Sequence, residues 1–274
     1  MIKKMKSLSK NKDVKKLSIN FLSLFSVQGL NILLPLITLP YLFRVLGVEK
    51  FGLIAFAFAT ITFFRVFVDY GFQLYATREI SQNINNKNKL NEIYNNILSN
   101  KILLLLFSFL ILNILILSSE KFSSEWVLFY FTFLFVVGEA IFPVWFFQGV
   151  EDMKYIGYLN LFAKIFFTIG IFIFIQNEND YVIQPLLNGL GMIFIGIYSL
   201  FLIHKKYEMK LQFESIENIK KTLISSWNIF ITQLMPNLYN NFSTFLLGFL
   251  TSMENVGYFS LATKIIDIAN SIIT

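Results

Sequence analysis

Six ionisable side chains lie well inside apolar stretches of this sequence, where an isolated charge is costly. They are Arg65, Asp69, Glu139, Lys164, Lys264 and Asp267. At mid-bilayer each would cost about 2.5–3.5 kcal/mol, so charges in such places mark ion or substrate paths by default. Unpaired cations there suit an anionic substrate. In "TFFRVFVD", residues 62–69, we expect Arg65 and Asp69 to face water and each other.

Uncharged polar residues fall on the same helical faces as these charges. Residues three or four apart share a face of a helix. The stripes are Gln28, Asn31, Pro35 and Thr38; Thr62, Arg65, Asp69 and Gln73; Asn160, Lys164 and Thr168; Gln233, Asn237, Asn240 or Asn241, and Thr244; and Lys264, Asp267 and Asn270. We expect the stripes to face a shared hydrated cavity, the alternative for some residues being structural contact between helices. The candidate cavity residues are Gln28, Asn31, Arg65, Asp69, Lys164, Lys264 and Asp267.

Long apolar blocks must position these residues. The 274-residue chain is 55% hydrophobic and 15% charged, whereas a soluble domain is nearer a quarter charged. The blocks do not alternate with a period of two, so they predict helices rather than barrel strands, and about 20 residues of helix cross the hydrocarbon core. We predict an all-α polytopic membrane protein with about eight transmembrane helices. The predicted spans are 17–43, 51–72, 97–117, 126–148, 155–175, 181–203, 223–250 and 256–274.

The basic residues predict an orientation. Seventeen of the 23 lysines and arginines fall on the side of the membrane that would hold the N-terminus, if Lys101 at the edge of its span is included. Three fall on the opposite side. Basic loops stay cytoplasmic, so we expect a cytoplasmic N-terminus. The net charge of +6 then reflects contact with anionic lipid, and no nucleic acid is needed to explain it.

A weak internal repeat predicts how the chain is divided. A shift of 205 residues gives 11 identities in 47 positions, including Gln28 with Gln233 and Gly52 with Gly257. Parallel repeats in transporters flank the substrate path. We expect a basic N-terminus (1–16), a first six-helix lobe (17–203), a linker (204–221) and the first two helices of a second lobe (222–274), as part of a transporter of roughly 400 residues. An intact eight-helix protein with a chance match is the alternative.

The sequence lacks the motifs of several other classes. It has no cysteine, no phosphate-binding G-x-x-x-x-G-K-[ST] loop and no metal-spaced His cluster. We expect no catalysis, no cofactor and no metal, so uphill transport would use an ion gradient or a partner. Asp69, Glu139 and Asp267 are the candidate ion-coupling residues, and the sequence does not choose among them.

Three segments together resemble the Wzx-type polysaccharide flippases of the multidrug/oligosaccharidyl-lipid/polysaccharide exporter superfamily. They are "LPYLFRVLGVEKFGLIAFA" (39–57), "VDYGFQLYATREIS" (68–81) and "FPVWFFQGVEDMKY" (142–155), with an echo of the first in "SMENVGYFSLATKI" (252–265). The resemblance implies two six-helix lobes around a central cavity. It also implies translocation of an undecaprenyl-diphosphate-linked oligosaccharide, such as an O-antigen unit, across the bacterial inner membrane by alternating access.

The resemblance also implies the partners and leaves rivals open. The partners would be the lipid-linked oligosaccharide, membrane lipids and other polysaccharide assembly proteins, with Arg65, Lys164 and Lys264 accompanying the diphosphate or acidic sugars. Related exporters of a peptidoglycan lipid precursor or a drug remain alternatives. A membrane glycosyltransferase or polymerase is disfavoured because it would need a large extramembrane loop. A scaffold without transport activity is the last alternative.

Overall fold

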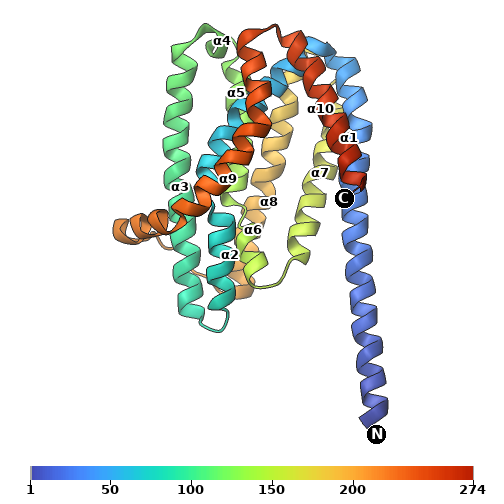
Figure 1. The fold of residues 1–274 in the computed structure, drawn as a ribbon, viewed down its shortest axis with the longest axis vertical. Coiled ribbons are helices and arrows are strands. Elements are labelled where there is room, and N and C mark those ends of the chain that lie inside the picture. Colours follow the sequence, from blue (N-terminus) through green and yellow to red (C-terminus); the bar gives the residue numbers. More distant parts are fainter. Residues whose placement is uncertain (1, 274) are drawn as a thin grey trace.

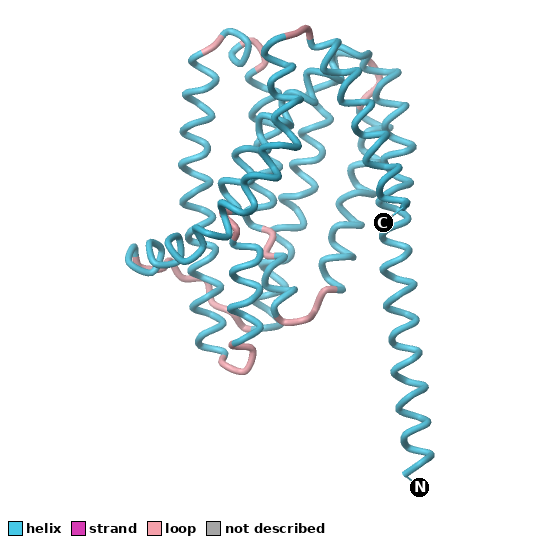
Figure 2. Tube along the Cα trace, in the orientation of Figure 1, coloured by secondary structure: helices cyan, strands magenta, loops and turns pink. Residues whose placement is uncertain are grey.

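The computed structural model describes the backbone of residues 2–273 and the side chains of residues 29, 33–237, 239 and 241–270. Over this backbone the chain forms helices joined by short turns, and it contains no β-strand (Figures 1 and 2). The helices are α1 (Ile2–Asp69), α2 (Phe72–Gln82), α3 (Lys87–Ser118), α4 (Glu120–Ser123), α5 (Trp126–Ile141), α6 (Val144–Gly149), α7 (Lys154–Phe174), the short 3₁₀ helix η1 (Glu178–Val182), α8 (Ile183–Tyr207), α9 (Ile216–Leu250) and α10 (Met253–Ile273).

Five helical segments are long and apolar enough to cross a membrane among the described residues. They are Leu33–Gln82, Lys87–Ser118, Trp126–Gly149, Lys154–Phe174 and Glu178–Tyr207. The prediction of an all-α polytopic membrane protein is therefore confirmed. The helices α9 and α10 overlap the predicted spans 223–250 and 256–274 but are not among the five. Amides along α9 and the charges of Glu254, Lys264 and Asp267 in α10 lower their apolar content.

The first of these segments folds back on itself, so one helix label covers two predicted spans. At Gly47 the backbone has φ 74° and ψ 166°, which interrupts the helical geometry of α1. A residue with a side chain rarely adopts this conformation, and glycine does so without steric cost. Residues before Gly47 rise along one edge of the bundle, and residues after it descend through the interior (Figure 1). The fold-back thus carries Arg65 and Asp69 into the bundle.

The helices α1 and α10 cross at two glycines that the 205-residue shift had aligned. A Cβ atom built on Gly52 would lie 1.8 Å from the carbonyl oxygen of Met253, and one built on Gly257 would lie 2.2 Å from that of Val48. The same shift of 205 residues aligns Val48 with Met253. The contact of Gly52 with Met253 and the contact of Gly257 with Val48 are therefore the same contact with the two helices exchanged. This reciprocity is the contact pattern of a two-fold axis.

Aromatic rings pack beside this crossing, at the end of the bundle where α1 folds back. Phe56 stacks on Phe122 and Phe245 at centroid distances of 5.8 and 6.0 Å, and the Cβ of any residue larger than glycine at 248 would collide with Phe56. The Lys121 ammonium lies 5.7 Å from the centre of the Phe249 ring. This end of the bundle is therefore closed by large side chains and close backbone contact.

At the opposite end of the bundle, Asp152 connects the turn between α6 and α7 to the end of α8. Its carboxylate accepts hydrogen bonds from Lys206 and from the Tyr207 hydroxyl, the latter at 2.7 Å. Burial opposes ionisation of Asp152, but these hydrogen bonds outweigh it and lower the pKa of the carboxyl. A carboxyl with a lowered pKa stabilises the fold above its ordinary pKa, and this contribution is lost as the pH falls through the lowered value. The turn between α6 and α7 is thereby held against the end of α8.

Candidate functional site

Two helix breaks face each other at the same depth in the bundle. The first separates α1 from α2, where Tyr70 and Gly71 have φ angles of 48° and 75°. The second separates α5 from α6 at Phe142 and Pro143, because proline has no N–H to continue the helix. Irregular backbone at membrane depth is tolerated where it lines a cavity or is covered by protein. The breaks therefore locate the candidate site.

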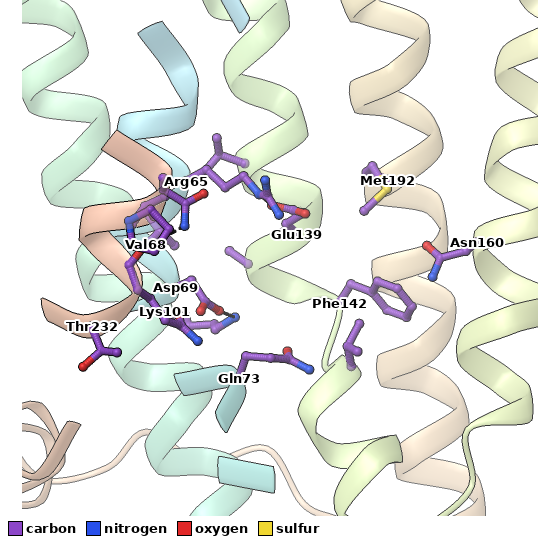
Figure 3. A pocket seen from close by; sticks show the side chains of 17 residues that line it. Arg65, Val68, Asp69, Gln73, Lys101, Glu139, Phe142, Asn160, Met192 and Thr232 are labelled. Carbon is purple, nitrogen blue, oxygen red and sulfur yellow. Dashed lines mark hydrogen bonds and ion pairs between the residues drawn. The ribbon is translucent and has the colours of Figure 1, made fainter. Parts of the chain in front are cut away.

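A cavity of about 590 Å³ lies between these two breaks. It is bounded by α1, α2, α3, α5, α6, α7, α8 and α9. The polar residues that line it are Arg65, Asp69, Gln73, Lys101, Glu139, Asn160, Thr232, Gln233 and Asn237. Figure 3 shows Arg65 and Glu139 pointing toward each other above Asp69 and Lys101. A cavity with polar walls thus lies within an apolar bundle.

The charges of the cavity form two ion pairs between different helices. Arg65 Nε of α1 lies 2.5 Å from Glu139 Oε2 of α5. Lys101 Nζ of α3 lies 3.0 Å from Asp69 Oδ1 of α1, and the Lys101 side chain is only 5% exposed. The two pairs are about one helical turn apart along α1. Each cation therefore has a carboxylate next to it, and the four groups sum to zero charge.

The predicted pairing of Arg65 with Asp69 is wrong. Residues four apart on one helix share a face, but each side chain here finds a closer partner on a neighbouring helix. A buried ammonium such as that of Lys101 is very costly without a counter-ion, whereas a pair within one exposed helix face gains little. Asp69 consequently pairs with Lys101, and Arg65 with Glu139.

Amide side chains cover the rest of the cavity wall. Gln73 Nε2 donates a hydrogen bond to Gln148 Oε1 at 2.6 Å, which joins α2 to α6, the two helices that follow the breaks. Asn237 Nδ2 donates to the Gln233 carbonyl oxygen at 2.9 Å on α9. Asn160 of α7 points into the cavity from the far side (Figure 3). Such groups can both donate and accept hydrogen bonds, as sugar hydroxyls require.

The structure brings together only part of the predicted site. Arg65, Asp69 and Glu139 line one cavity, but Lys164 is half-buried on α7 and does not line it. Lys264 is exposed on α10, with its ammonium 5.0 Å from the centre of the Phe51 ring, and Asp267 is exposed on the same helix. Gln28 and Asn31 lie outside the residues whose side chains are described.

Lys101 is the functional candidate that sequence reasoning missed. It lies four residues inside the predicted span 97–117, and it had been assigned to the basic edge that sets orientation. In the structure it is buried because α9 and the segment before it cover this part of α3. A signal was present in "SNKILLLLF", where a lysine directly precedes an apolar run.

Removing the carboxylate of Asp69 should destabilise the protein. Asp69→Ala leaves the Lys101 ammonium buried without its counter-ion, and we expect a loss of about 2–3 kcal/mol in the free energy of unfolding, since Asp69 itself is 30% exposed. The apparent Tm of the purified protein should fall. The double variant Asp69→Leu/Lys101→Met removes both charges and should recover most of the loss. Equal destabilisation by the single and double variants would contradict this account.

Comparison with known proteins places this geometry in context. A family model described as "Polysaccharide biosynthesis protein" matches residues 17–274. A protein of Escherichia coli (strain K12) named "Putative O-antigen transporter" is 31% identical over 247 residues, which cover 90% of this chain and 59% of that protein. A protein of the same name from Shigella dysenteriae is also 31% identical over 247 residues, with 90% and 62% covered. The chain thus spans about three fifths of the length of these relatives. No solved structure matches it.

Proposed function

The chain belongs to the polysaccharide biosynthesis protein family, and from this premise we propose that it is a flippase for a lipid-linked oligosaccharide. The substrate would be an undecaprenyl-diphosphate-linked repeat unit, such as an O-antigen unit. It would cross the bacterial inner membrane by alternating access, with the N-terminus of the protein in the cytoplasm. The protein would move this molecule without changing it chemically. The observation that carries the proposal is the charged, amide-lined cavity inside an apolar membrane bundle.

The paired charges supply a site for the diphosphate. Arg65 of α1 and Lys101 of α3 are two cations that line the same cavity. Guanidinium and ammonium groups form strong charge-assisted hydrogen bonds with phosphate oxygens. In the structure each cation is held by a carboxylate, so an anionic substrate must compete with Asp69 and Glu139 for them. The lipid tail can remain among the acyl chains outside the bundle.

That competition gives a route to ion coupling. A proton that binds Glu139 or Asp69 neutralises the carboxylate and releases its cation toward the substrate. Loss of the proton restores the ion pair and expels the diphosphate. Substrate and proton are then coupled through the same two pairs, without a separate ion site. Asp267 lies on α10 away from this cavity and takes no part in the scheme.

The amides supply contacts for the sugars. Gln73, Asn160, Gln233 and Asn237 surround the cavity from three helices, and they match the mixed donors and acceptors of a carbohydrate. A peptidoglycan lipid precursor also joins sugars to a lipid diphosphate, so the same chemistry favours it as the second candidate substrate. The equal number of cations and carboxylates disfavours a simple cationic drug, because no carboxylate of the cavity is without a cation among the described residues.

Complementation of a flippase-deficient strain tests the proposal. We expect surface polysaccharide to be restored by this chain extended with the C-terminal part of its relatives, and lipid-linked repeat units to stop accumulating in the inner membrane. A strain depleted of its peptidoglycan precursor flippase provides the second arm. Rescue of that strain alone would replace O-antigen units by the peptidoglycan precursor. Failure in both strains, despite normal membrane insertion, would overturn the proposed function.

A further inference from the structure

The segment between α8 and α9 is an ordered strand-like connection that climbs along α3. Its backbone N–H groups at alternate positions donate to α3 side chains four residues apart. The pairs are Lys210 with Asn91 (2.7 Å), Gln212 with Asn95 (2.9 Å) and Glu214 with Ser99 (3.3 Å). Two extended residues and four helical residues both advance by about 6–7 Å, so the spacings match. The intervening Leu211 and Phe213 therefore point outward, and they are 63% and 86% exposed.

The start of α9 then lies crosswise against α3. Figure 1 shows this first portion of α9 projecting beyond α3 before the helix turns along the bundle. Asn96 of α3 donates to Thr222 Oγ1 at 2.7 Å and to the Asn218 carbonyl oxygen at 3.5 Å, which fixes the crossing point. Thr222, Ser226 and Phe230 are buried on the side facing the bundle. The opposite side of this portion is open.

The open side of α9 is divided into an apolar strip and a polar strip. Each strip recurs at helical spacing, so each is a continuous line along the helix. The apolar strip consists of Ile216, Ile224 and Trp227 with one cation, Lys220, among them. The polar strip consists of Glu217, Lys221, Ser225 and Asn228, and all eight residues are exposed. We call Leu211, Phe213 and the apolar strip together the interfacial strip. Of the two strips, only the interfacial strip would expose large apolar side chains to water.

The polar strip faces the charged end of the bundle, where α2 connects to α3. Lys221 and Ser225 line a small cavity together with Glu79 of α2 and Lys89 and Glu92 of α3. The interfacial strip lies on a different face of α9 from the residues that line this cavity, and it points away from the cavity. Along α3 that direction leads to the band of exposed apolar side chains that begins at Leu103. The two strips are thus oriented like a water–lipid boundary.

The depth of the crossing agrees with this orientation. Asn96 lies seven residues before Leu103, or about 10 Å along the helix. The headgroup region of a bilayer occupies about 5–8 Å outside the hydrocarbon core, so the crossing lies just outside this region. Side chains that extend about 5 Å from the axis of α9 toward Leu103 reach into the boundary at which amphipathic helices settle. Trp227 has the ring type enriched there. Lys220 sits between apolar neighbours, so its ammonium can reach the phosphates while its methylene stem stays among acyl chains.

We propose that the interfacial strip docks on an anionic phospholipid leaflet, with Lys220 binding the headgroup phosphates. The occupant is a lipid surface because the strip combines outward apolar side chains, a central cation and a position at headgroup depth. This docking fixes the start of α9, whose next turns carry Thr232 and Gln233 into the cavity wall. The inference does not depend on which substrate the cavity transports.

Site-specific fluorescence quenching tests where the strip lies. The chain has no cysteine, so Ile224→Cys and Ser225→Cys each provide a single labelling site on adjacent strips. In nanodiscs containing phosphatidylglycerol, we expect a label at 224 to be quenched by doxyl groups on lipid and protected from aqueous iodide. The label at 225 should show the reverse. Quenching of both labels by iodide, or protection of 224 from both quenchers by a covering protein, would overturn the proposal.

Two neighbouring lysines test the charge preference. As phosphatidylglycerol replaces phosphatidylcholine, the emission of the label at 224 should shift, and the midpoint measures the affinity for anionic lipid. Lys220→Gln should weaken this affinity about fivefold, because one lysine near a charged surface contributes that much. Lys221→Gln, on the polar strip, should leave it within about twofold. Equal losses in both variants, or no loss for Lys220→Gln, would show that the strip does not bind headgroups.

Discussion

Arg65→Ala should reduce transport about thirtyfold in the extended protein, because a charge-assisted hydrogen bond from Arg65 to a substrate phosphate would be worth about 2 kcal/mol. The variant removes a cation that we assign to the diphosphate and leaves Glu139 without its partner. Binding of purified lipid-linked oligosaccharide should weaken in parallel. Arg78→Ala is the matched control, since Arg78 is exposed on α2 and does not line the cavity. It should transport at the level of the unaltered protein.

Glu139→Gln should behave in the opposite way toward substrate binding. The amide no longer neutralises Arg65, so we expect binding to be kept or strengthened while the response of transport to a pH gradient is lost. Uptake by inverted vesicles, with and without a pH gradient, separates these effects. If Glu139→Gln weakens binding as much as Arg65→Ala does, the pair serves only to join α1 to α5, and the coupling scheme fails.

Gly52→Ala and Gly257→Ala should each destabilise the protein by about 2–3 kcal/mol, despite the higher helix propensity of alanine. In both variants the added methyl group would overlap a backbone carbonyl oxygen of the other helix. The measurement is the apparent Tm of the purified protein in one detergent. Because both substitutions push apart the same crossing, the double variant should lose less than the two single losses added together.

Gly191→Ala provides the matched control for this crossing. Gly191 lies within α8, and the nearest atom to an added Cβ would be in the Phe166 ring at 3.5 Å, an ordinary contact. This variant should be neutral or stabilised by up to about 1 kcal/mol through helix propensity. A Tm for Gly52→Ala that matches the control would mean that α1 and α10 do not approach closely.

The fold class could be predicted from composition, but the pairing of the charges could not. Long apolar blocks require helices in a membrane, and the stripes on single helices follow from periodicity alone. Which stripe meets which depends on the rotation and register of whole helices, which the sequence does not reveal residue by residue. Asp69 therefore pairs with a lysine 32 positions away rather than with Arg65.

Two further differences have the same origin. Lys164 and Lys264 were expected in the cavity, yet they lie on faces of α7 and α10 that do not line it. The case for an anionic substrate now rests on Arg65 and Lys101 instead. The predicted linker 204–221 ends inside α9, which begins at Ile216 because Ser215 caps it through a hydrogen bond from the Asn218 N–H. The division of the chain into lobes stays a prediction.

The depth of the Asp69–Lys101 pair also decides which force could drive transport. Lys101 lies two residues, or about 3 Å, from Leu103, where the lipid-facing band of α3 begins. Lys101 precedes Leu103, so the pair lies at the edge of the ~30 Å core, and a proton that reaches Asp69 from this side crosses at most about a tenth of it. A membrane potential of 100 mV then changes the energy of this proton by no more than about 0.2 kcal/mol. Protonation at this carboxylate would thus respond to the acidity of the adjoining compartment and hardly at all to voltage.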